Sequence, residues 1–397
     1  MNRFYSYINT SLKLITSFKG EKPFAVFIRQ FFSANKKYGS RDRRQISSLC
    51  YNYFRLGFGA FNLAPEDKIL LAFFLCETAT SEFLEKLKPE WNEKINLSLQ
   101  EKLAFVKDEF SLAAILPFTK NLSEGIDPEA FCKSLLIQPS LFLRVRPHAN
   151  ARTLKKLEKS KLIYETIGED CIRMPIGTNV QEILTIDKDV VIQDYNSQQV
   201  LNFFRKDVYQ PKLNADASDP RLTVWDCCAA SGGKSILLMD IFGNNLDLTI
   251  SDIRPSIVLN LHQRFKRAGI KEYKYFISDI GQPDFTPISS DFDLIICDAP
   301  CSGSGTWSRT PESLYYFKET SISDYNKLQK KITSNAFPHL KRGGIFVYIT
   351  CSVFKNENED IAAFIQEKFN CKLLEQKMLT GFTKKADSMF TAVFQKL

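Results

Sequence analysis

The chain has 397 residues, of which 44% are hydrophobic and 25% are charged. This length suffices for two or three domains with buried cores, and the composition excludes a collagen-like, low-complexity or wholly disordered protein. The net charge of +8 is concentrated in residues 1–44, where ten Lys and Arg residues are opposed only by Glu21 and Asp42. Such a basic, aromatic-rich segment favours contact with phosphates, although basic helix faces also serve solubility alone.

The ten cysteines are too scattered for a disulfide framework, and no apolar signal segment follows Met1. The longest apolar run, Ile69–Cys76, is far shorter than the roughly 20 residues that a bilayer requires. We therefore expect a cytoplasmic protein with free thiols and no membrane contact. Cys-x-x-Cys pairs are absent and the chain has only three His, so no metal site is expected.

Apolar residues at helical spacing predict an all-α domain over residues 1–138. One helix is expected over Arg3–Phe18, and a second begins after Pro23 and continues to Gly39. Ser40 is expected to cap a third helix, and Asp127 followed by proline is typical of another helix start.

After Pro139 the pattern changes. Residues 139–190 are expected to form a small α+β connector with strands at Leu141–Arg146 and Cys171–Met174 and a helix over Leu154–Lys161. Residues 191–397 alternate β-rich runs with helix-length stretches, which predicts an α/β, doubly wound, Rossmann-like parallel sheet. Its five expected strands are Leu222–Trp225, Leu246–Ile250, Lys274–Ile277, Phe292–Cys297 and Ile345–Thr350.

An aspartate closely follows four of these five strands, namely Asp226, Asp252, Asp279 and Asp298. In an open parallel sheet, ligands bind beyond the carboxyl ends of the strands. A single aspartate in such a place is commonly an ordinary turn residue. Four of them together indicate one binding site.

The first strand leads into a loop of small residues, Cys228-Ala229-Ala230-Ser231-Gly232-Gly233-Lys234. Such a loop lets backbone amides approach a ligand closely at a helix start. A Walker loop is disfavoured because Cys228 stands where its first glycine is needed, and no GxGxxG is present. A cofactor with a carboxylate, a ribose and an adenine but no phosphates fits, so S-adenosylmethionine is expected. Asp252 would then accept hydrogen bonds from the ribose, and Asp279 would face the adenine.

Two cysteines follow neighbouring strands, Cys301 in Asp298-Ala299-Pro300-Cys301 and Cys351 after the fifth strand. Methylation of carbon 5 of cytosine needs a thiolate that adds to carbon 6 and is later expelled when the proton leaves carbon 5. Two thiols beside a methyl donor suit these steps, whereas the motifs of a zinc-dependent cytosine deaminase are missing. Cysteine is also a common small apolar core residue, and we interpret Cys50, Cys76, Cys132, Cys171 and Cys371 in that way.

Together these motifs resemble those of the Sun/NOP family of RNA cytosine-carbon-5 methyltransferases. Asp226–Ser235 is similar to the family's D-x-C-A-A-P-G-G-K-T loop, and Asp298–Gly305 to its D-A-P-C-S-G-x-G segment. Thr350-Cys351-Ser352 with Asn356-Glu357-Asn358-Glu359 resembles its T-C-S and E-N-E segments. Upstream, Ser40–Arg44 with Arg55 resembles the NusB-like RNA-binding domain of the bacterial 16S members, and Leu143–Pro147 resembles the start of their RNA-recognition-like connector.

The resemblance implies that Cys351 is the nucleophile and that Cys301 assists release of the methylated base. It implies a cofactor site formed by Cys228, Ala229, Ala230, Ser231, Gly232, Gly233, Lys234, Asp252, Asp279 and Asp298, with Asp298 also near the target base. Ser231 replaces the family's usual proline, so a looser loop and a lower cofactor affinity are expected.

The expected substrate is RNA, with 16S ribosomal RNA favoured and the target cytosine in a loop or turned out of its stack. The basic segment, together with Arg144, Arg146 and Arg152, is expected to hold the RNA backbone in a salt-dependent manner. A monomer is expected. A transfer RNA substrate is an alternative, and so is a non-catalytic RNA-binding assembly factor that retains the fold.

Overall fold

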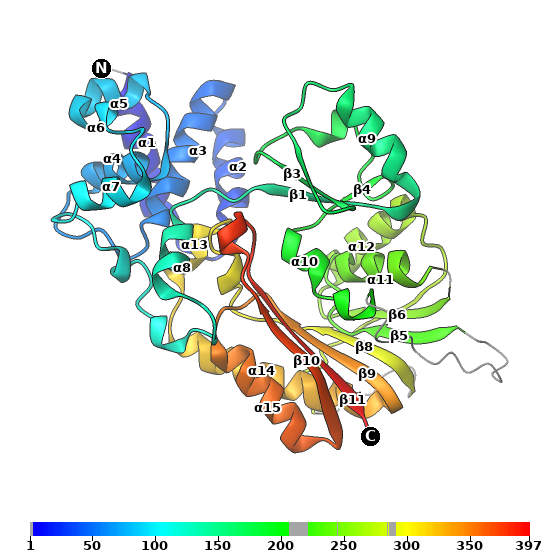
Figure 1. Ribbon diagram of the computed structural model, residues 1–397. Helices are drawn as coiled ribbons and strands as arrows, with labels where there is room; N and C mark the ends of the chain where they lie inside the picture. The colour runs from blue at the N-terminus through cyan, green and yellow to red at the C-terminus, as the bar shows by residue number, and fades with distance from the viewer. Residues whose placement is uncertain (1–2, 206–220, 244, 284, 286–290) are drawn as a thin grey trace. The chain divides into compact units, whose positions relative to one another are not determined.

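The computed structural model describes residues 3–205, 221–243, 245–283, 285 and 291–397 (Figure 1). The chain divides into two compact units. A helical unit comprises Met1–Leu122, Ile126–Gln138 and Thr306–Glu319, and a sheet unit comprises Ser123–Gly125, Pro139–Gly305 and Thr320–Leu397. The sequence prediction assigned Thr306–Glu319 to the catalytic domain, whereas its contacts place this segment in the helical unit.

The helical unit contains short and medium helices, which agrees with the all-α domain predicted for residues 1–138. Its α-helices are α1 (Arg3–Ser17), α2 (Phe24–Ala34), α3 (Ser40–Arg55), α4 (Pro65–Cys76), α5 (Glu82–Leu87), α6 (Pro89–Glu93), α7 (Leu99–Phe105), α8 (Pro128–Leu135) and α13 (Pro311–Tyr316). The expected cap of α8 is confirmed, because the Asp127 carboxylate accepts from the Ala130 amide at 2.6 Å.

Two expected helix boundaries in this unit are wrong. The second helix ends at Ala34, several residues before the predicted Gly39. Ser40 is the first residue of α3 and does not cap it. Gly39 occupies the cap position, and the Asp42 carboxylate accepts from the Gly39 amide at 3.0 Å. The Asp42 side chain therefore satisfies the amide of the cap residue, while no side chain at the cap position accepts from the first turn of α3.

Aromatic side chains form the core where α13 joins the N-terminal helices. Phe18 packs edge-on against Phe24 and Tyr316, with ring centroids 5.1 and 5.3 Å apart. The Tyr316 hydroxyl donates to the Phe18 carbonyl at 2.7 Å, and the Glu312 carboxylate accepts from the Phe24 amide at 3.2 Å. The contacts of Glu312 and Tyr316 with Phe24 and Phe18 span almost 300 positions of sequence, which is why local patterns did not predict them.

The connector within the sheet unit is a four-stranded antiparallel sheet with the order β2-β3-β1-β4. Its elements are β1 (Leu141–Val145), α9 (Asn150–Glu158), β2 (Glu165–Ile167), β3 (Cys171–Met174) and β4 (Val190–Ile192). Leu157 of α9 packs with Leu143 and Ile172 in one apolar cluster. The predicted α+β character of residues 139–190 agrees with this arrangement.

A seven-stranded sheet forms the rest of the unit, in the order β10-β11-β9-β8-β5-β6-β7. The expected strands are confirmed as β5 (Leu222–Asp226), β6 (Leu246–Asp252), β7 (Lys274–Ile277), β8 (Phe292–Asp298) and β9 (Leu340–Thr350), and all are parallel. Two further strands, β10 (Cys371–Leu379) and β11 (Met389–Lys396), are antiparallel and were not predicted. The order from β7 to β9 is that of a Rossmann-type sheet.

Side-chain alternation along the strands divides the core between the two faces of the sheet. On β8, Leu294 and Ile296 point to one face and Ile295 and Cys297 to the other. Helices α11 (Gly233–Phe242) and α12 (Pro255–Ala268) cover the first face, and α14 (Thr320–Ala336) and α15 (Glu359–Lys368) cover the second (Figure 1). The short helix α10 (Tyr195–Gln199) precedes β5 in the chain.

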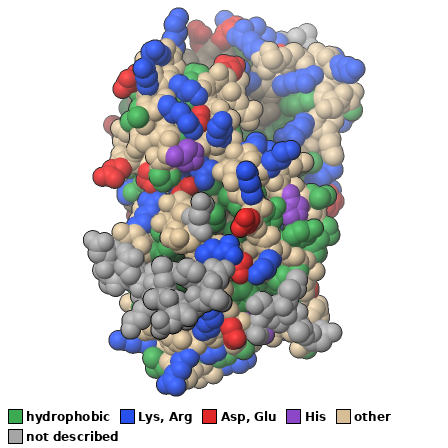
Figure 2. Space-filling view, turned by 90° about the vertical axis from the view of Figure 1, so that its right-hand side faces the viewer, with side chains coloured by type: hydrophobic (Ala, Val, Ile, Leu, Met, Phe, Trp, Pro, Cys, Tyr) green, Lys and Arg blue, Asp and Glu red, His purple; other side chains and the backbone are tan. Residues whose placement is uncertain are grey.

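Basic side chains are spread over the face of the molecule shown in Figure 2. On α9 and directly after it, Lys155, Lys159 and Lys161 are exposed. In the N-terminal segment, the basic residues from Arg3 to Arg44 are exposed apart from Arg43, whose Nε donates to the Tyr38 carbonyl. Among the residues that the structure describes, none of the helices has the length and apolar character to cross a membrane.

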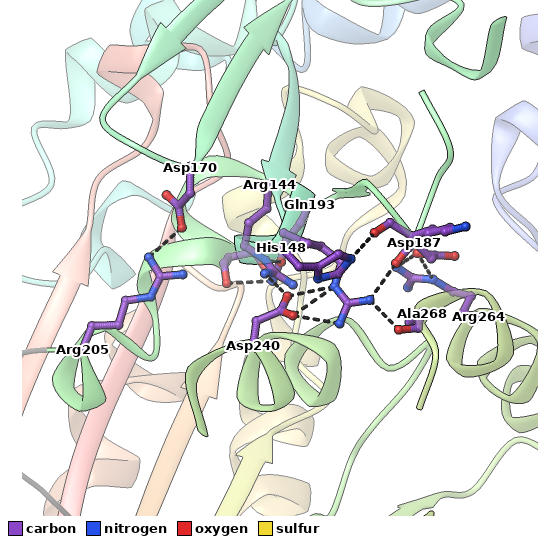
Figure 3. Close-up of polar contacts among 12 residues, drawn as sticks. Arg144, His148, Asp170, Asp187, Gln193, Arg205, Asp240, Arg264 and Ala268 are labelled. Atoms are coloured by element: carbon purple, nitrogen blue, oxygen red, sulfur yellow. Dashed lines mark hydrogen bonds and ion pairs between the residues drawn. The ribbon is translucent and has the colours of Figure 1, made fainter. Parts of the chain in front are cut away.

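Two connector arginines that were expected to hold RNA are buried instead. Arg144 of β1 is fully buried, and its guanidinium bonds to the Asp240 carboxylate on α11 and to Gln193 Oε1 (Figure 3). Arg146 is 6% exposed and donates to Asp240 at 2.8 Å and to the Ala268 carbonyl at 2.5 Å. These arginines attach the connector to α11 and α12, so the prediction of RNA contact is wrong for both.

Two further arginines also have partners within the chain: Arg152, which was expected to hold RNA, and Arg55, which was named only in the resemblance to the RNA-binding domain. Arg152 is exposed, but its guanidinium pairs with Asp189 at 2.6 Å. Arg55 on α3 is 4% exposed and donates to the Leu135 carbonyl at 2.9 Å. Burial of a guanidinium is costly unless each donor finds an acceptor, so a buried arginine with such partners has a structural role.

Asp240→Asn is expected to lower the free energy of unfolding by about 3–5 kcal/mol, because it leaves two buried guanidiniums without their counter-charge. Urea denaturation of the whole chain measures this change. Asp247→Asn is the control, since Asp247 pairs with Lys274 at the surface and its loss should cost about 1 kcal/mol or less. Equal effects of the two substitutions would contradict the structural role assigned to Asp240.

Candidate active site

The carboxyl ends of five parallel strands place the predicted site residues at one edge of the sheet. Asp226, Asp252 and Asp298 are the last residues of β5, β6 and β8, Asp279 follows β7, and Cys351 follows β9. Because β8 lies between β5 and β9, the loop after it can contact the loops after both neighbours. The sheet order therefore brings the cofactor loop and the two cysteine loops together.

The loop between β5 and α11 has the backbone that a closely bound ligand requires. Ala230 and Gly232 both adopt left-handed conformations, with φ of +45° and +81°. A β-carbon at position 232 would lie 2.6 Å from the Phe265 ring, so glycine is required there for packing as well. A β-carbon at Gly233 would meet no heavy atom within 4 Å, so the backbone is open at the first residue of α11. This opening fits a cofactor that approaches the helix N-terminus.

Asp226 stabilises the end of the cofactor loop through a hydrogen bond with the first turn of α11. Its side chain is fully buried, and its Oδ2 accepts from the Ser235 hydroxyl of α11 at 2.6 Å. Burial raises the pKa of Asp226 to about 7, against the hydrogen bond from Ser235, which lowers it. The buried Asp226 carboxylate therefore holds the start of α11 in place through Ser235 and is not accessible to a ligand.

Asp252 lies at the end of β6, as the sequence predicted, but both oxygens of its carboxylate already accept two hydrogen bonds each from the protein. Oδ1 accepts from the amide and Nε of Arg254, and Oδ2 accepts from Arg254 Nη2 and the Ala230 amide, all at 2.9–3.0 Å. Burial would raise the pKa of Asp252, but the hydrogen bonds from Arg254 outweigh it and lower the pKa. The Arg254 side chain is 56% exposed, so it can move away when a ribose needs these oxygens.

Asp279 accepts hydrogen bonds within its own turn. Its Oδ1 accepts from the Gly281 amide at 2.9 Å and its Oδ2 from Gln282 Nε2 at 2.8 Å. These bonds shape the turn that follows the edge strand β7. Its predicted contact with adenine stays a prediction.

The two predicted catalytic cysteines lie in contact. Cys301 Sγ and Cys351 Sγ are 3.3 Å apart, and both side chains are partly exposed. The hydrogen bond with Cys351, together with burial, raises the pKa of Cys301 well above that of an ordinary thiol. Cys301 therefore holds its proton more strongly than an ordinary thiol does, and its sulfur is in hydrogen-bond contact with that of Cys351.

A lysine and a carboxylate complete this edge of the site. Lys234 Nζ lies 2.7 Å from Asp298 Oδ2, and both side chains are mostly buried. Burial would lower the pKa of Lys234, but attraction to Asp298 and to Cys351 outweighs it and raises the pKa. The Lys234 ammonium is thus a mostly buried positive charge that pairs with Asp298 and is also attracted to Cys351.

The sequence prediction assigned no role to Glu357, although it lies in the matched E-N-E segment. Glu357 is fully buried, and its carboxylate accepts from the Ser302 amide and the Ser352 hydroxyl, each at 2.7 Å. Its neighbour Asn358 donates to the Ser352 carbonyl at 3.0 Å. Ser302 directly follows Cys301, and Ser352 directly follows Cys351. By binding these serines, Glu357 and Asn358 fix the separation of the two cysteine loops.

Three more thiols lie close together at the start of the cofactor loop, an arrangement that the sequence spacing did not predict. Cys227, Cys228 and Cys297 have sulfur atoms within 4.8 Å of one another. Cys227 and Cys297 are fully buried among Trp225, Ile295 and other apolar side chains. Burial raises the pKa of Cys227 well above its ordinary value, which suits a protonated core thiol.

The strand order, the small-residue loop before α11 and the acidic strand ends define a class I, Rossmann-like methyltransferase domain. Residues 214–394 match the model of the family described as 16S rRNA methyltransferase RsmB/F. Residues 214–394 are thus similar to that Sun/NOP family, as the resemblance of the motifs implied. The cofactor of the family is S-adenosylmethionine, which fits the open backbone at Gly233.

Curated relatives carry related names. The probable ribosomal RNA small subunit methyltransferase B of Bacillus subtilis (strain 168) is 30% identical over 246 residues, covering 60% of this chain and 52% of that protein. Ribosomal RNA small subunit methyltransferase B of Enterobacter sp. (strain 638) is 29% identical over 252 residues, covering 62% and 55%. The chain thus spans about half the length of the curated relatives it matches.

Solved structures share the fold. The crystal structure of PH0851 aligns with a TM-score of 0.71 over 98% of both chains, at 18% identity. A methyltransferase homolog protein from Pyrococcus horikoshii aligns with a TM-score of 0.53, covering 77% of this chain and 97% of that one, at 20% identity. At these identities the likeness shows the fold alone.

Arg254→Ala is expected to tighten binding of S-adenosylhomocysteine by a few-fold, because the exposed ion pair that competes for Asp252 is removed. Isothermal titration calorimetry of the whole chain measures the change in Kd. Arg221→Ala, which removes another exposed ion pair, with Glu272, serves as the control and should leave Kd unchanged. Weaker binding by the Arg254 variant would show that this arginine helps to hold the cofactor.

Proposed function

We propose that the protein transfers a methyl group from S-adenosylmethionine to carbon 5 of a cytosine in RNA, with 16S ribosomal RNA as the favoured substrate. The observation that carries this proposal is the 3.3 Å contact between Cys301 Sγ and Cys351 Sγ beside Lys234 and Asp298. A methyltransferase acting on an amino or hydroxyl group needs no thiol, whereas carbon 5 of cytosine needs a thiolate to activate it. The names of the relatives in the RsmB/F family agree with a ribosomal RNA substrate.

In this proposal Cys351 is the nucleophile. Its sulfur lies within hydrogen-bond distance of Cys301 Sγ, and attraction between Cys351 and the Lys234 ammonium contributes to the raised pKa of Lys234. A hydrogen bond donated by Cys301 and the positive charge of Lys234 would both stabilise a thiolate at Cys351. The thiolate forms a bond to carbon 6 of cytosine, and the electron pair moves to carbon 5. Asp298 can accept a hydrogen bond from the exocyclic amino group of the base. When bound at the loop, S-adenosylmethionine supplies the electrophilic methyl group.

Cys301 then takes part in release of the product. Once Cys351 is bonded to carbon 6, it no longer carries a negative charge, so a thiolate at Cys301 meets no like charge on the neighbouring sulfur. At this stage Cys301, which is partly exposed, gives its own proton to solvent water, and the resulting thiolate accepts the proton from carbon 5. The electrons of that C–H bond re-form the ring double bond, and the Cys351–carbon bond breaks. The positions of the two thiols thus suit two different steps of one reaction.

Cys351→Ala is expected to lower tritium transfer from labelled S-adenosylmethionine to small-subunit ribosomal RNA by about a thousandfold or more, because the nucleophile is lost. Cys301→Ala is expected to accumulate a covalent protein–RNA adduct, seen as a slow band on a denaturing gel. Cys371→Ala removes a thiol of β10 outside the site, and its activity should stay within about twofold of wild type.

The same assay separates the alternatives. Full activity of Cys351→Ala would contradict the assignment of the nucleophile. Activity on transfer RNA with none on ribosomal RNA would change the substrate. A wild-type chain that is inactive on every RNA would favour the non-catalytic assembly factor. Bisulfite sequencing of RNA from cells with and without the gene identifies the cytosine.

The exposed arginines at the start of α3 are proposed to contact RNA phosphates. The paired substitution of Arg41 and Arg44 to Gln should weaken RNA binding and reduce the log–log salt slope by about 1 to 2, since about 0.7 is lost per phosphate contact on single strands. Filter binding at several salt concentrations measures the slope. The same charge change at exposed Lys86 and Lys107, outside the basic segment, is the control and should leave the slope unchanged.

A further inference from the structure

The cofactor loop is held from outside by one arginine of α12. Arg264 Nη1 donates to both the carbonyl and the hydroxyl of Ser231, each at 2.9 Å. Ser231 stands between Ala230 and Gly232, whose backbones are both left-handed. A left-handed conformation is unfavourable for alanine, so this stretch keeps its shape only if neighbouring structure holds it.

Asp187 of the connector fixes the position of that arginine. Its Oδ1 accepts from Arg264 Nε and Nη2 at 3.1 and 2.9 Å (Figure 3). Asp187 is fully buried, and the Arg264 side chain is only 14% exposed. The Arg264 guanidinium has little freedom to move, because Nε and Nη2 bond to the Asp187 carboxylate while Nη1 bonds to the loop at Ser231.

A second arginine of α12 provides an internal comparison. Arg267 binds the other oxygen of the same carboxylate, with Nη2 2.8 Å from Asp187 Oδ2. No contact of Arg267 with the cofactor loop is found among the described residues, and its side chain is 47% exposed. The two arginines therefore share Asp187, but only Arg264 connects it to Ser231.

We propose that Arg264, held by Asp187, is a positioning residue that fixes the cofactor loop through Ser231 and so sets the affinity for S-adenosylmethionine. The proposal rests on the proposed function for the identity of the cofactor. A proline at position 231, as the Sun/NOP motif has, would restrict the loop through its own ring. Serine lacks that restriction, and the two hydrogen bonds from Arg264 replace it. The lower affinity expected from Ser231 alone is therefore offset by a contact that only the folded chain provides.

The test is a set of calorimetric titrations with S-adenosylhomocysteine, which need neither RNA nor the catalytic thiols. Arg264→Leu is expected to raise Kd about tenfold, the effect of losing a hydrogen bond to a charged group. Arg267→Leu removes an ion pair from the same carboxylate and should change Kd by less than about twofold. Ser231→Pro should bind at least as tightly as wild type, and adding Arg264→Leu to it should raise Kd by less than about twofold.

Two results would overturn the proposal. One is an equal rise in Kd for the Arg264 and Arg267 variants, which would indicate a general effect of the ion pairs. The other is a tenfold rise that persists in the Ser231→Pro background. Thermal unfolding of each variant checks its fold. If Arg264→Leu does not fold, Arg264→Lys carries the test, because lysine can pair with Asp187 but cannot reach both Ser231 acceptors in the same geometry.

Failure of this inference is distinguishable from failure of the proposed function. A wild-type chain that does not bind S-adenosylhomocysteine would contradict the cofactor assignment, and this inference with it. A wild-type chain that binds it and methylates RNA, while Arg264→Leu binds equally well, would overturn only the role of Arg264.

Discussion

The parallel alignment of five strands is the constraint on which the candidate site depends. Each strand ends at the same edge of the sheet, so residues from 226 to 351 converge there despite their separation in sequence. The order places β8 between β5 and β9, and its loop therefore meets both the lysine of the cofactor loop and the second cysteine. Neither sulfur would have a partner if β9 lay elsewhere in the sheet.

Burial determines which charged residues of this chain are available for function. Arg144 and Arg146 belong to a basic stretch that suggests RNA contact, yet both are buried against Asp240 because the connector packs on α11. Asp226 and Glu357 are likewise buried and hold backbone and hydroxyl groups beneath the site. In contrast, Lys234 and Asp298 keep some exposure, which a pair that meets a cofactor or a base requires. The cost of an unpaired buried charge explains why each buried group has a specific partner.

The site is built as an inner set of reactive groups with an outer set that holds them. The thiols, Lys234 and Asp298 form the inner set. Glu357 and Asn358 fix the two cysteine loops, and Arg264 with Asp187 contacts the cofactor loop. Precise placement of reactive groups lowers the barrier of a two-reactant step, so outer residues of this kind matter for rate or affinity without touching substrate.

Local sequence determined the parts of this protein that depend on nearest neighbours along the chain. Strand periodicity located β5 to β9, the Asp-Pro pair located the start of α8, and small residues after β5 identified the cofactor loop. The two cysteines proposed to react could be picked out in the sequence because each lies in a contiguous motif. Strands β10 and β11, the assignment of Thr306–Glu319 to the helical unit, the buried arginines and the contact of Arg264 with Ser231 were decided only by tertiary structure. Each of these features depends on which residues, distant in sequence, pack together and become buried from water. No short stretch of sequence contains that information.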